Sequence, residues 1–125
     1  MKTLGITIGL VKIPVTDFAR ATAFYRDVLG LEEQFAVEQY GWAQYSTGPV
    51  SLCLYVVGMG GGNGKPGGDV GVQLRVSDAK AAHAIVTSRG GKVGKLEIGD
   101  DGTVAFDIYD PDGNKVSVAQ VPVEG

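Results

Sequence analysis

Hydrophobic and polar positions follow two different periods near the start of this chain. Residues 10–15 alternate between the two kinds, which is the period of a strand with one buried face. In residues 18–29 the apolar positions recur every three or four residues, as they do on a helix that packs by one side. Asp17 is placed to cap this helix and Gly30 to end it. The pattern predicts a strand followed by a helix that covers one face of that strand.

The same pattern occurs twice. Val15-Thr16-Asp17 opens the first helix and Val76-Ser77-Asp78 opens a second, which is 78 − 17 = 61 residues further on and close to half of the 125 residues. After each helix the strand period returns three times, between turn signals such as Thr47-Gly48-Pro49 and Asp110-Pro111-Asp112-Gly113-Asn114. The predicted strands are 33–37, 42–47 and 51–56 in the first half and 70–76, 92–98, 104–109 and 115–121 in the second, with the second helix at 78–89.

Each half therefore predicts a β-α-β-β-β module in an α+β protein. Such a module leaves an apolar face uncovered, and pairing two modules covers it and makes the space between them a natural ligand site. The chain forms one domain, residues 1–125, with module one at about 5–57, a glycine-rich linker at about 58–69 and module two at about 70–122. The apolar run 1–11 contains no signal-peptide cleavage site, and we expect a strand there.

Charge and cysteine content narrow the possible partners. Eleven Lys and Arg against 14 Asp and Glu give a net charge of −3 without a basic run, so we expect neither nucleic acid nor a membrane as a partner. Cys53 is the only cysteine, which excludes an intrachain disulfide and is compatible with a reducing, cytoplasmic location.

Several motifs together resemble one protein family. They are Val15-x-Asp17, the segment Ala23-Phe24-Tyr25-x-x-Val28-Leu29-Gly30-Leu31, Val76-x-Asp78, and Asp110-Pro111-Asp112-Gly113-Asn114. In this order and spacing they resemble the vicinal oxygen chelate superfamily of glyoxalases, bleomycin-resistance proteins and extradiol dioxygenases. The resemblance covers nearly the whole chain. It implies two βαβββ modules whose curved sheets form an open trough, and a homodimer in which modules pair within or between chains.

The resemblance also implies where a metal would be held, because family enzymes use His and Glu on the first and fourth strands of each module. Those positions fall on Leu10 and Gly71, on Cys53 or Tyr55 in a register that the sequence leaves open, and on Ser117. A transition-metal site needs three or four converging imidazole, carboxylate or thiolate donors. We therefore expect no metal and no other cofactor.

Three other features have plain structural explanations. His83, the only histidine, lies inside the second predicted helix, where a packing or solvent-facing role is expected. No imidazole is placed to activate Cys53, so a buried apolar role is expected for its thiol. The glycine-rich stretch 58–68 is followed by a strand and not by the helix that a phosphate loop requires, which favours a flexible linker with a possible role as a lid.

Strand alternation assigns a set of side chains to the trough. Trp42 and Tyr45 fall on opposite faces of one strand, and Trp42 is the better candidate for an aromatic wall. Lys12, Arg75, Asp107 and Lys115 have a second interpretation, in which they are charges at the rim or are internally paired. The predicted ligand-binding residues are Lys12, Trp42, Cys53, Tyr55, Gln73, Arg75, Asp107 and Tyr109.

Three classes of function compete for this trough. The first is metal-independent binding of a small planar or partly apolar molecule, as in drug-sequestering resistance proteins of the family. The second is a lyase, isomerase or dioxygenase with relocated or absent metal ligands, acting through Lys12, Arg75, Asp107 and Tyr109. The third is a structural module that binds a protein partner. The first fits best, because losing the metal ligands removes the Lewis acid but keeps the cavity.

Overall fold

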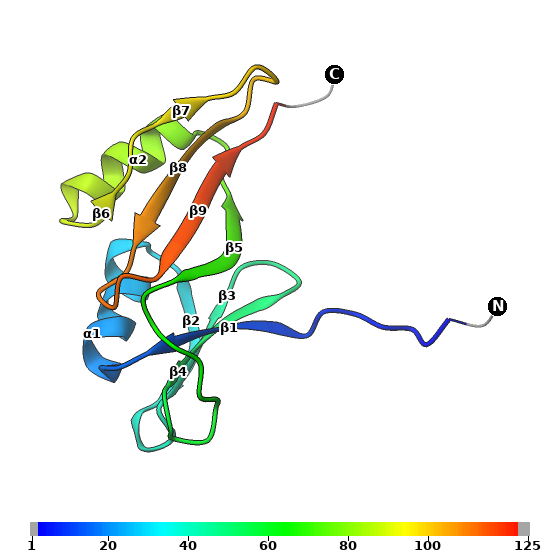
Figure 1. Ribbon diagram of the computed structural model, residues 1–125, viewed down its shortest axis with the longest axis vertical. Helices are drawn as coiled ribbons and strands as arrows, with labels where there is room; N and C mark the ends of the chain where they lie inside the picture. The colour runs from blue at the N-terminus through cyan, green and yellow to red at the C-terminus, as the bar shows by residue number, and fades with distance from the viewer. Residues whose placement is uncertain (1–2, 123–125) are drawn as a thin grey trace.

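The computed structural model describes residues 3–122 and has two similar halves (Figure 1). Each half contains a four-stranded path of strands with a helix against one face, in the orders β1-β4-β3-β2 and β5-β9-β8-β6, with β7 paired to β8. The first strand of each half is parallel to the last, and the remaining pairs are antiparallel. None of the helices in this part of the chain is long and apolar enough to cross a bilayer. The predicted α+β arrangement of two β-α-β-β-β modules is confirmed.

The first module begins at Leu10 and follows the predicted strands closely. Its helix is capped by Asp17, whose carboxylate accepts a hydrogen bond from the Arg20 amide at 2.9 Å. The helix ends in a wider π turn, in which the Leu29 amide donates to the Phe24 carbonyl. The elements are β1 (Leu10–Val15), α1 (Phe18–Ala23), the π-helical η1 (Phe24–Val28), β2 (Glu32–Val37), the 3-10 turn η2 (Glu38–Tyr40), β3 (Trp42–Ser46) and β4 (Ser51–Val56).

The second module repeats this order with one interruption. Residues 92–98, predicted as one strand, form two short strands on β8, and between them the Gly94 amide donates to the Asp107 carbonyl. The pairing is irregular there, so the prediction of a continuous strand was wrong. The elements are β5 (Asp69–Arg75), α2 (Ala79–Ser88), β6 (Lys92–Val93), β7 (Glu97–Ile98), β8 (Val104–Tyr109) and β9 (Lys115–Gln120).

The predicted strand over residues 1–11 is also wrong for its described part before Leu10; Met1 and Lys2 lie outside the described residues. Residues 3–9 extend away from the body without regular secondary structure (Figure 1). Leu4, Ile6 and Ile8 are 87%, 81% and 70% exposed. An alternating apolar pattern forms a strand only where a neighbouring backbone is available to pair with it, and within residues 3–122 no strand pairs with residues 3–9.

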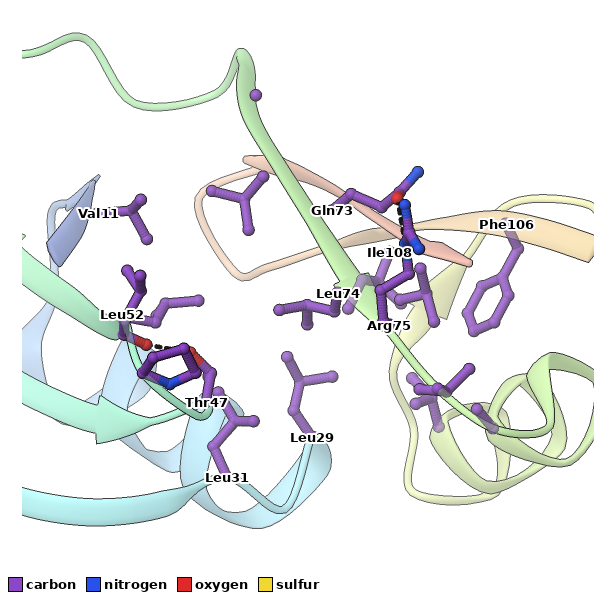
Figure 2. Close-up of a pocket in the computed structure, with 18 residues that line it drawn as sticks. Val11, Leu29, Leu31, Thr47, Leu52, Gln73, Leu74, Arg75, Phe106 and Ile108 are labelled. Carbon is purple, nitrogen blue, oxygen red and sulfur yellow. Dashed lines mark hydrogen bonds between the residues drawn. The ribbon is translucent and has the colours of Figure 1, made fainter. Parts of the chain in front are cut away.

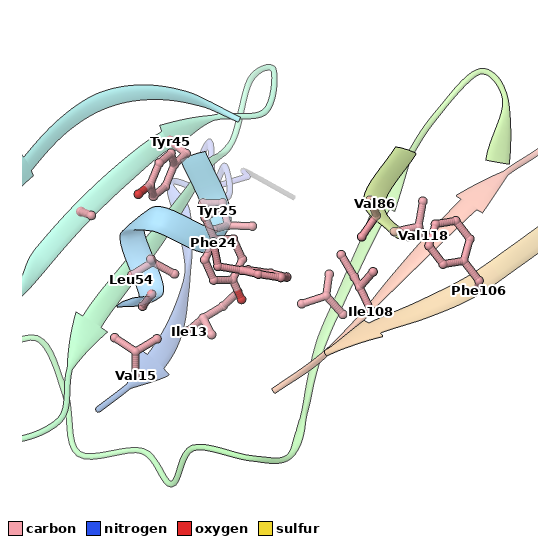
Figure 3. Close-up of a cluster of buried hydrophobic side chains, with 14 of the residues drawn as sticks. Ile13, Val15, Phe24, Tyr25, Tyr45, Leu54, Val86, Phe106, Ile108 and Val118 are labelled. Carbon is pink, nitrogen blue, oxygen red and sulfur yellow. The ribbon is translucent and has the colours of Figure 1, made fainter. Parts of the chain in front are cut away.

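The core lies between each helix and its sheet. Figure 3 shows Tyr25 and Leu54 in module one, and Phe106 and Ile108 beside α2 in module two. All four are at least 97% buried. Alternate strand residues supply this core, so the other set of alternate residues lies on the helix-free face of each sheet.

A polar joint connects the two modules. The Tyr25 hydroxyl donates to Asp110 at 2.8 Å, and the fully buried Asn114 donates its amide to the Pro14 carbonyl at 2.8 Å. Asn114 also donates to Asp110 at 2.9 Å and accepts from the Gly67 amide at 2.8 Å. The turn between β8 and β9 thus fixes module two against η1, β1 and the segment that joins the modules (Figure 1).

Candidate functional site

The helix-free face of module one carries a row of side chains in register. Lys12 is paired with Cys53, and Cys53 with Gln44, across three neighbouring strands. Two residues further along β4, Tyr55 is paired with Trp42. Paired residues share a face of a sheet, so both Cys53 and Tyr55 lie on this face, where the sequence had left the choice open. Tyr45 lies on the opposite, helix-covered face, as predicted, and is fully buried.

The glycine-rich segment 58–68 lies over part of this face. The Gly61 carbonyl accepts a hydrogen bond from Lys12 Nζ at 2.6 Å, and the Gly64 amide donates to the Tyr55 hydroxyl at 3.1 Å. A Cβ atom added to Gly61 would come within 2.6 Å of Tyr55 Cβ and 3.2 Å of Trp42 Cε3. The segment predicted as a flexible linker thus packs on the sheet at these positions, and its role as a lid stays a prediction. The packed backbone at these positions has no room for a side chain, and glycine meets that requirement.

Lys12 is the cation of this face. Its ammonium lies 5.3 Å from the centre of the Tyr55 ring, within the range of a cation–π contact. The Trp42 indole N–H donates to Gln44 at 3.3 Å, and its ring remains partly exposed beside Gly61. Module one thus offers an ammonium and two aromatic rings close together, partly covered by the chain's own backbone.

Cys53 lies beneath these groups and is fully buried. Burial raises the pKa of its thiol, and the nearby Lys12 ammonium opposes this only in part. A raised pKa reduces the fraction of thiolate, the nucleophilic form of cysteine. The arrangement agrees with the apolar role expected from the sequence.

The helix-free face of module two carries the remaining predicted residues. Arg75 Nε donates to Gln73 at 2.6 Å, and Lys115 forms an ion pair with Asp69 at 3.4 Å. Tyr109 lies beside a separate polar cleft of about 470 Å³, which Lys92 and the β8–β9 turn also line. Lys115 is thus paired, as one of the two readings of the sequence had it.

An apolar groove of about 610 Å³ runs between the modules (Figure 2). Leu29 and Leu31 approach it from module one, and Leu74 points into it from β5. Gln73 and Arg75 also line it, whereas the other six predicted ligand-binding residues do not. One chain therefore brings Lys12, Trp42, Cys53 and Tyr55 together on one face and Gln73 with Arg75 at the groove. Their predicted roles in ligand binding stay predictions.

The side chains at the family's metal positions do not fit a metal. Leu10 offers only carbon, Gly71 has no side chain and Ser117 offers a neutral hydroxyl. The remaining position falls on Cys53, a fully buried thiol with a raised pKa, or on Tyr55, whose hydroxyl accepts from the Gly64 amide. Within residues 3–122 no three His, Cys, Asp or Glu side chains are grouped to hold an ion. His83 is engaged elsewhere: its Nε2 lies 2.9 Å from the Gly94 carbonyl oxygen, and its ring contacts Phe106 edge to face.

Sequence reasoning missed two functional features of this region. The cover formed by residues 58–68 depends on contacts with Trp42 and Tyr55 that no local pattern reveals, although the density of glycine was a signal. Asn114 was identified only as part of a turn, yet it holds one end of this segment through Gly67. The motif Asp110-Pro111-Asp112-Gly113-Asn114 was the available signal for a role beyond the turn.

The class of protein follows from this architecture of two β-α-β-β-β modules joined in one chain. Residues 7–118 match the model of the Glyoxalase/Bleomycin resistance protein/Dioxygenase superfamily. The chain therefore belongs to that superfamily.

Solved structures of the same superfamily are similar over nearly the whole chain. A member from Sphaerobacter thermophilus has a TM-score of 0.82 at 25% identity, covering 94% of this chain and 99% of that one. TnmS3, an antibiotic binding protein from a Streptomyces species, has a TM-score of 0.80 at 23% identity, covering 97% and 100%. Lactoylglutathione lyase from Agrobacterium tumefaciens has a TM-score of 0.79 at 20% identity, covering 94% and 96%. No curated protein matches the chain in sequence.

Proposed function

We propose that this protein binds a small planar, partly apolar molecule on its helix-free faces without using a metal. The observation that carries the proposal is the grouping of Lys12, Trp42 and Tyr55 on one face of module one, within a described chain that groups no three His, Cys, Asp or Glu side chains. Flat rings bind flat molecules by stacking, and an ammonium binds an acceptor oxygen or a carboxylate. The superfamily includes antibiotic-binding proteins, of which TnmS3 is one with the same fold.

The alternative, metal-free catalysis, needs acid, base and substrate to converge. Across residues 3–122 no hydrogen bond joins any two of Lys12, Arg75, Asp107 and Tyr109. Lys12 is bonded to a backbone carbonyl and Arg75 to Gln73. This separation favours binding over catalysis.

Quenching of Trp42 fluorescence tests the proposal, because Trp42 is the only tryptophan. A panel of planar natural products and metabolites would be titrated against the wild type, Lys12→Ala and Arg75→Ala. We expect at least one compound to quench Trp42, and each substitution to weaken its binding by about 1–3 kcal/mol, the range for losing a charged hydrogen-bond partner.

Lys80→Ala is the matched control, since Lys80 is exposed on α2. It should leave the affinity unchanged. Equal affinities in the wild type, Lys12→Ala and Arg75→Ala would place the site elsewhere, and a panel without any binder would contradict the proposal.

A further inference from the structure

The segment 58–68 occupies the groups that the proposed function assigns to a ligand. Its Gly61 carbonyl takes the hydrogen bond of the Lys12 ammonium, and its Gly64 amide donates to the Tyr55 hydroxyl. Cβ atoms built on Gly61 and Gly62 would collide with the Tyr55 side chain, so the backbone itself lies against that residue. The segment thus presents an acceptor oxygen and an N–H donor on flat peptide groups.

One end of this segment is bonded to module two, and its middle is bonded to the sheet of module one. At one end, the Gly67 amide donates to the fully buried Asn114, and the Gly68 carbonyl accepts from the Lys115 amide at 2.9 Å. The middle is bonded to the sheet by Lys12 and Tyr55, and a third bond, from the Gly58 amide to the Gly62 carbonyl at 3.2 Å, closes the loop on itself.

Glycine loses more conformational freedom on ordering than any other residue, so release of the middle recovers entropy that offsets much of the lost bonding. Residues 61–64 are therefore able to leave the face while Gly67 and Gly68 stay bonded to module two.

We propose that residues 61–64 are an internal competitor for the ligand: they cover Lys12, Trp42 and Tyr55 until a planar molecule displaces them. This inference rests on the proposed function and specifies its ligand class. The ligand carries an acceptor oxygen for Lys12 and an N–H or O–H donor for the Tyr55 hydroxyl, beside a flat apolar ring system. Binding affinity is reduced by the fraction of molecules in which the cover is closed.

The first measurement needs no ligand. Gly61→Ala introduces a Cβ that would lie 2.6 Å from Tyr55 Cβ, so the cover has to lift. Gly68→Ala is the matched control in the same segment, because a Cβ there meets nothing within 4 Å. We expect acrylamide to quench Trp42 roughly two-fold more strongly in Gly61→Ala than in the wild type or Gly68→Ala.

The second measurement uses anilinonaphthalene sulfonate, a flat probe with both an acceptor group and an N–H donor. It should bind Gly61→Ala about five- to tenfold more tightly than Gly68→Ala, because the competing backbone is gone. Circular dichroism and urea unfolding establish that the variants are folded. Tyr55→Phe, which adds no atom and removes the acceptor of the Gly64 amide, is the second opening variant and should also increase acrylamide quenching of Trp42. Probe affinity is compared only between Gly61→Ala and Gly68→Ala, because Tyr55→Phe also removes the hydroxyl assigned to the ligand.

Each failure has its own signature. Unchanged acrylamide quenching in both opening variants would show that the segment does not cover Trp42. Greater quenching in Gly61→Ala, with probe binding equal to or weaker than in Gly68→Ala, would show that the segment does not compete. Either result overturns this inference. The proposed function fails separately if no planar compound binds the wild type or Gly61→Ala.

Discussion

At the residue scale, Asn114 connects both modules through one side chain. Its side chain makes three hydrogen bonds, to Pro14, Gly67 and Asp110, and it is fully buried. A buried polar group that loses its partner is left without solvent to replace it, which costs more than the hydrogen bond itself contributes. Module one, module two and the glycine-rich segment thus share one amide.

Asn114→Ala should lower the free energy of unfolding by about 2–3 kcal/mol, because it leaves the Pro14 carbonyl and the Gly67 amide without their partner. Urea unfolding followed by circular dichroism measures this. Asn63→Ala is the control: Asn63 is exposed, and the change should stay within about 0.5 kcal/mol. Equal midpoints for the two variants would contradict the role assigned to the joint.

Tyr25 makes the joint sensitive to alkaline pH. Burial, reinforced by the negative charge of Asp110, raises the pKa of Tyr25 far above its usual value near 10. The folded state therefore keeps a proton that the unfolded chain releases above about pH 10. Stability from this group is complete below that pH and is lost as the pH rises.

Tyr25→Phe should remove this dependence, at the cost of the hydrogen bond to Asp110. Between about pH 10 and 11.5 the wild type should lose stability more steeply than Tyr25→Phe, by up to about 1.4 kcal/mol per pH unit for one proton. Urea midpoints at several pH values give both slopes. Parallel slopes would mean that Tyr25 ionises as easily in the folded chain as in the unfolded one.

Residue positions could be predicted from the sequence where a local period decides them. Trp42 and Tyr45 lie on opposite faces as predicted, because alternation along a strand is a property of the strand alone. The contacts of Asn114 were beyond such reasoning, since Gly67 and Pro14 lie 47 and 100 residues away in sequence. In the candidate site, the side chains on the strands could be predicted from alternation. The contacts of the segment 58–68 that covers them could not.

At the scale of elements, both helices begin at an aspartate. Asp17 accepts from the Arg20 amide and Asp78 from the Ala81 amide, each at 2.9 Å. Asp17→Ala and Asp78→Ala should each lower the free energy of unfolding by about 1 kcal/mol, the usual loss for a helix cap. Asp100→Ala, in an exposed turn, should change it little. If the three variants unfold at the same urea concentration, the caps contribute nothing.

Helices and strands were predicted well where local caps and periodicity define them. They were predicted less well where strand formation depends on pairing with another strand. The capped helices and β8 agree closely with the prediction, whereas residues 3–9 and 92–98 do not. Residues 3–9 have the alternation of a strand but no partner, and residues 92–98 have a partner but irregular pairing around Gly94. Strand formation depends on a second backbone, which periodicity does not report.

At the scale of the whole molecule, the helix-free faces of the two modules do not meet in one chain. Lys12 bonds to the segment 58–68, Arg75 bonds within β5, and the modules join through the β8–β9 turn. β1 and β5 are edge strands, and Leu4, Ile6 and Ile8 are exposed. Open edges and exposed apolar side chains favour association with a second copy. We therefore expect a homodimer in which modules of different chains face each other.

Mixing two variants tests this arrangement. If each trough takes module one from one chain and module two from the other, a heterodimer of Lys12→Ala and Arg75→Ala has one intact trough and one lacking both cations. After the variants are unfolded and refolded together, about a quarter of all troughs should bind a Trp42-quenching compound with wild-type affinity. A monomer at micromolar concentration in sedimentation, or no recovery on mixing, would exclude exchange between chains.

The burial of Cys53 has a practical consequence for working with this protein. A thiol that is fully buried and has a raised pKa reacts slowly with oxidants and alkylating reagents. Because Cys53 is the only cysteine, the native protein should stay free of disulfide-linked species during storage without reductant. Its rate of labelling by an aromatic disulfide then reports how often the helix-free face of module one becomes exposed. Absorbance of the released aromatic thiol therefore measures the rate at which this face opens, without any added label.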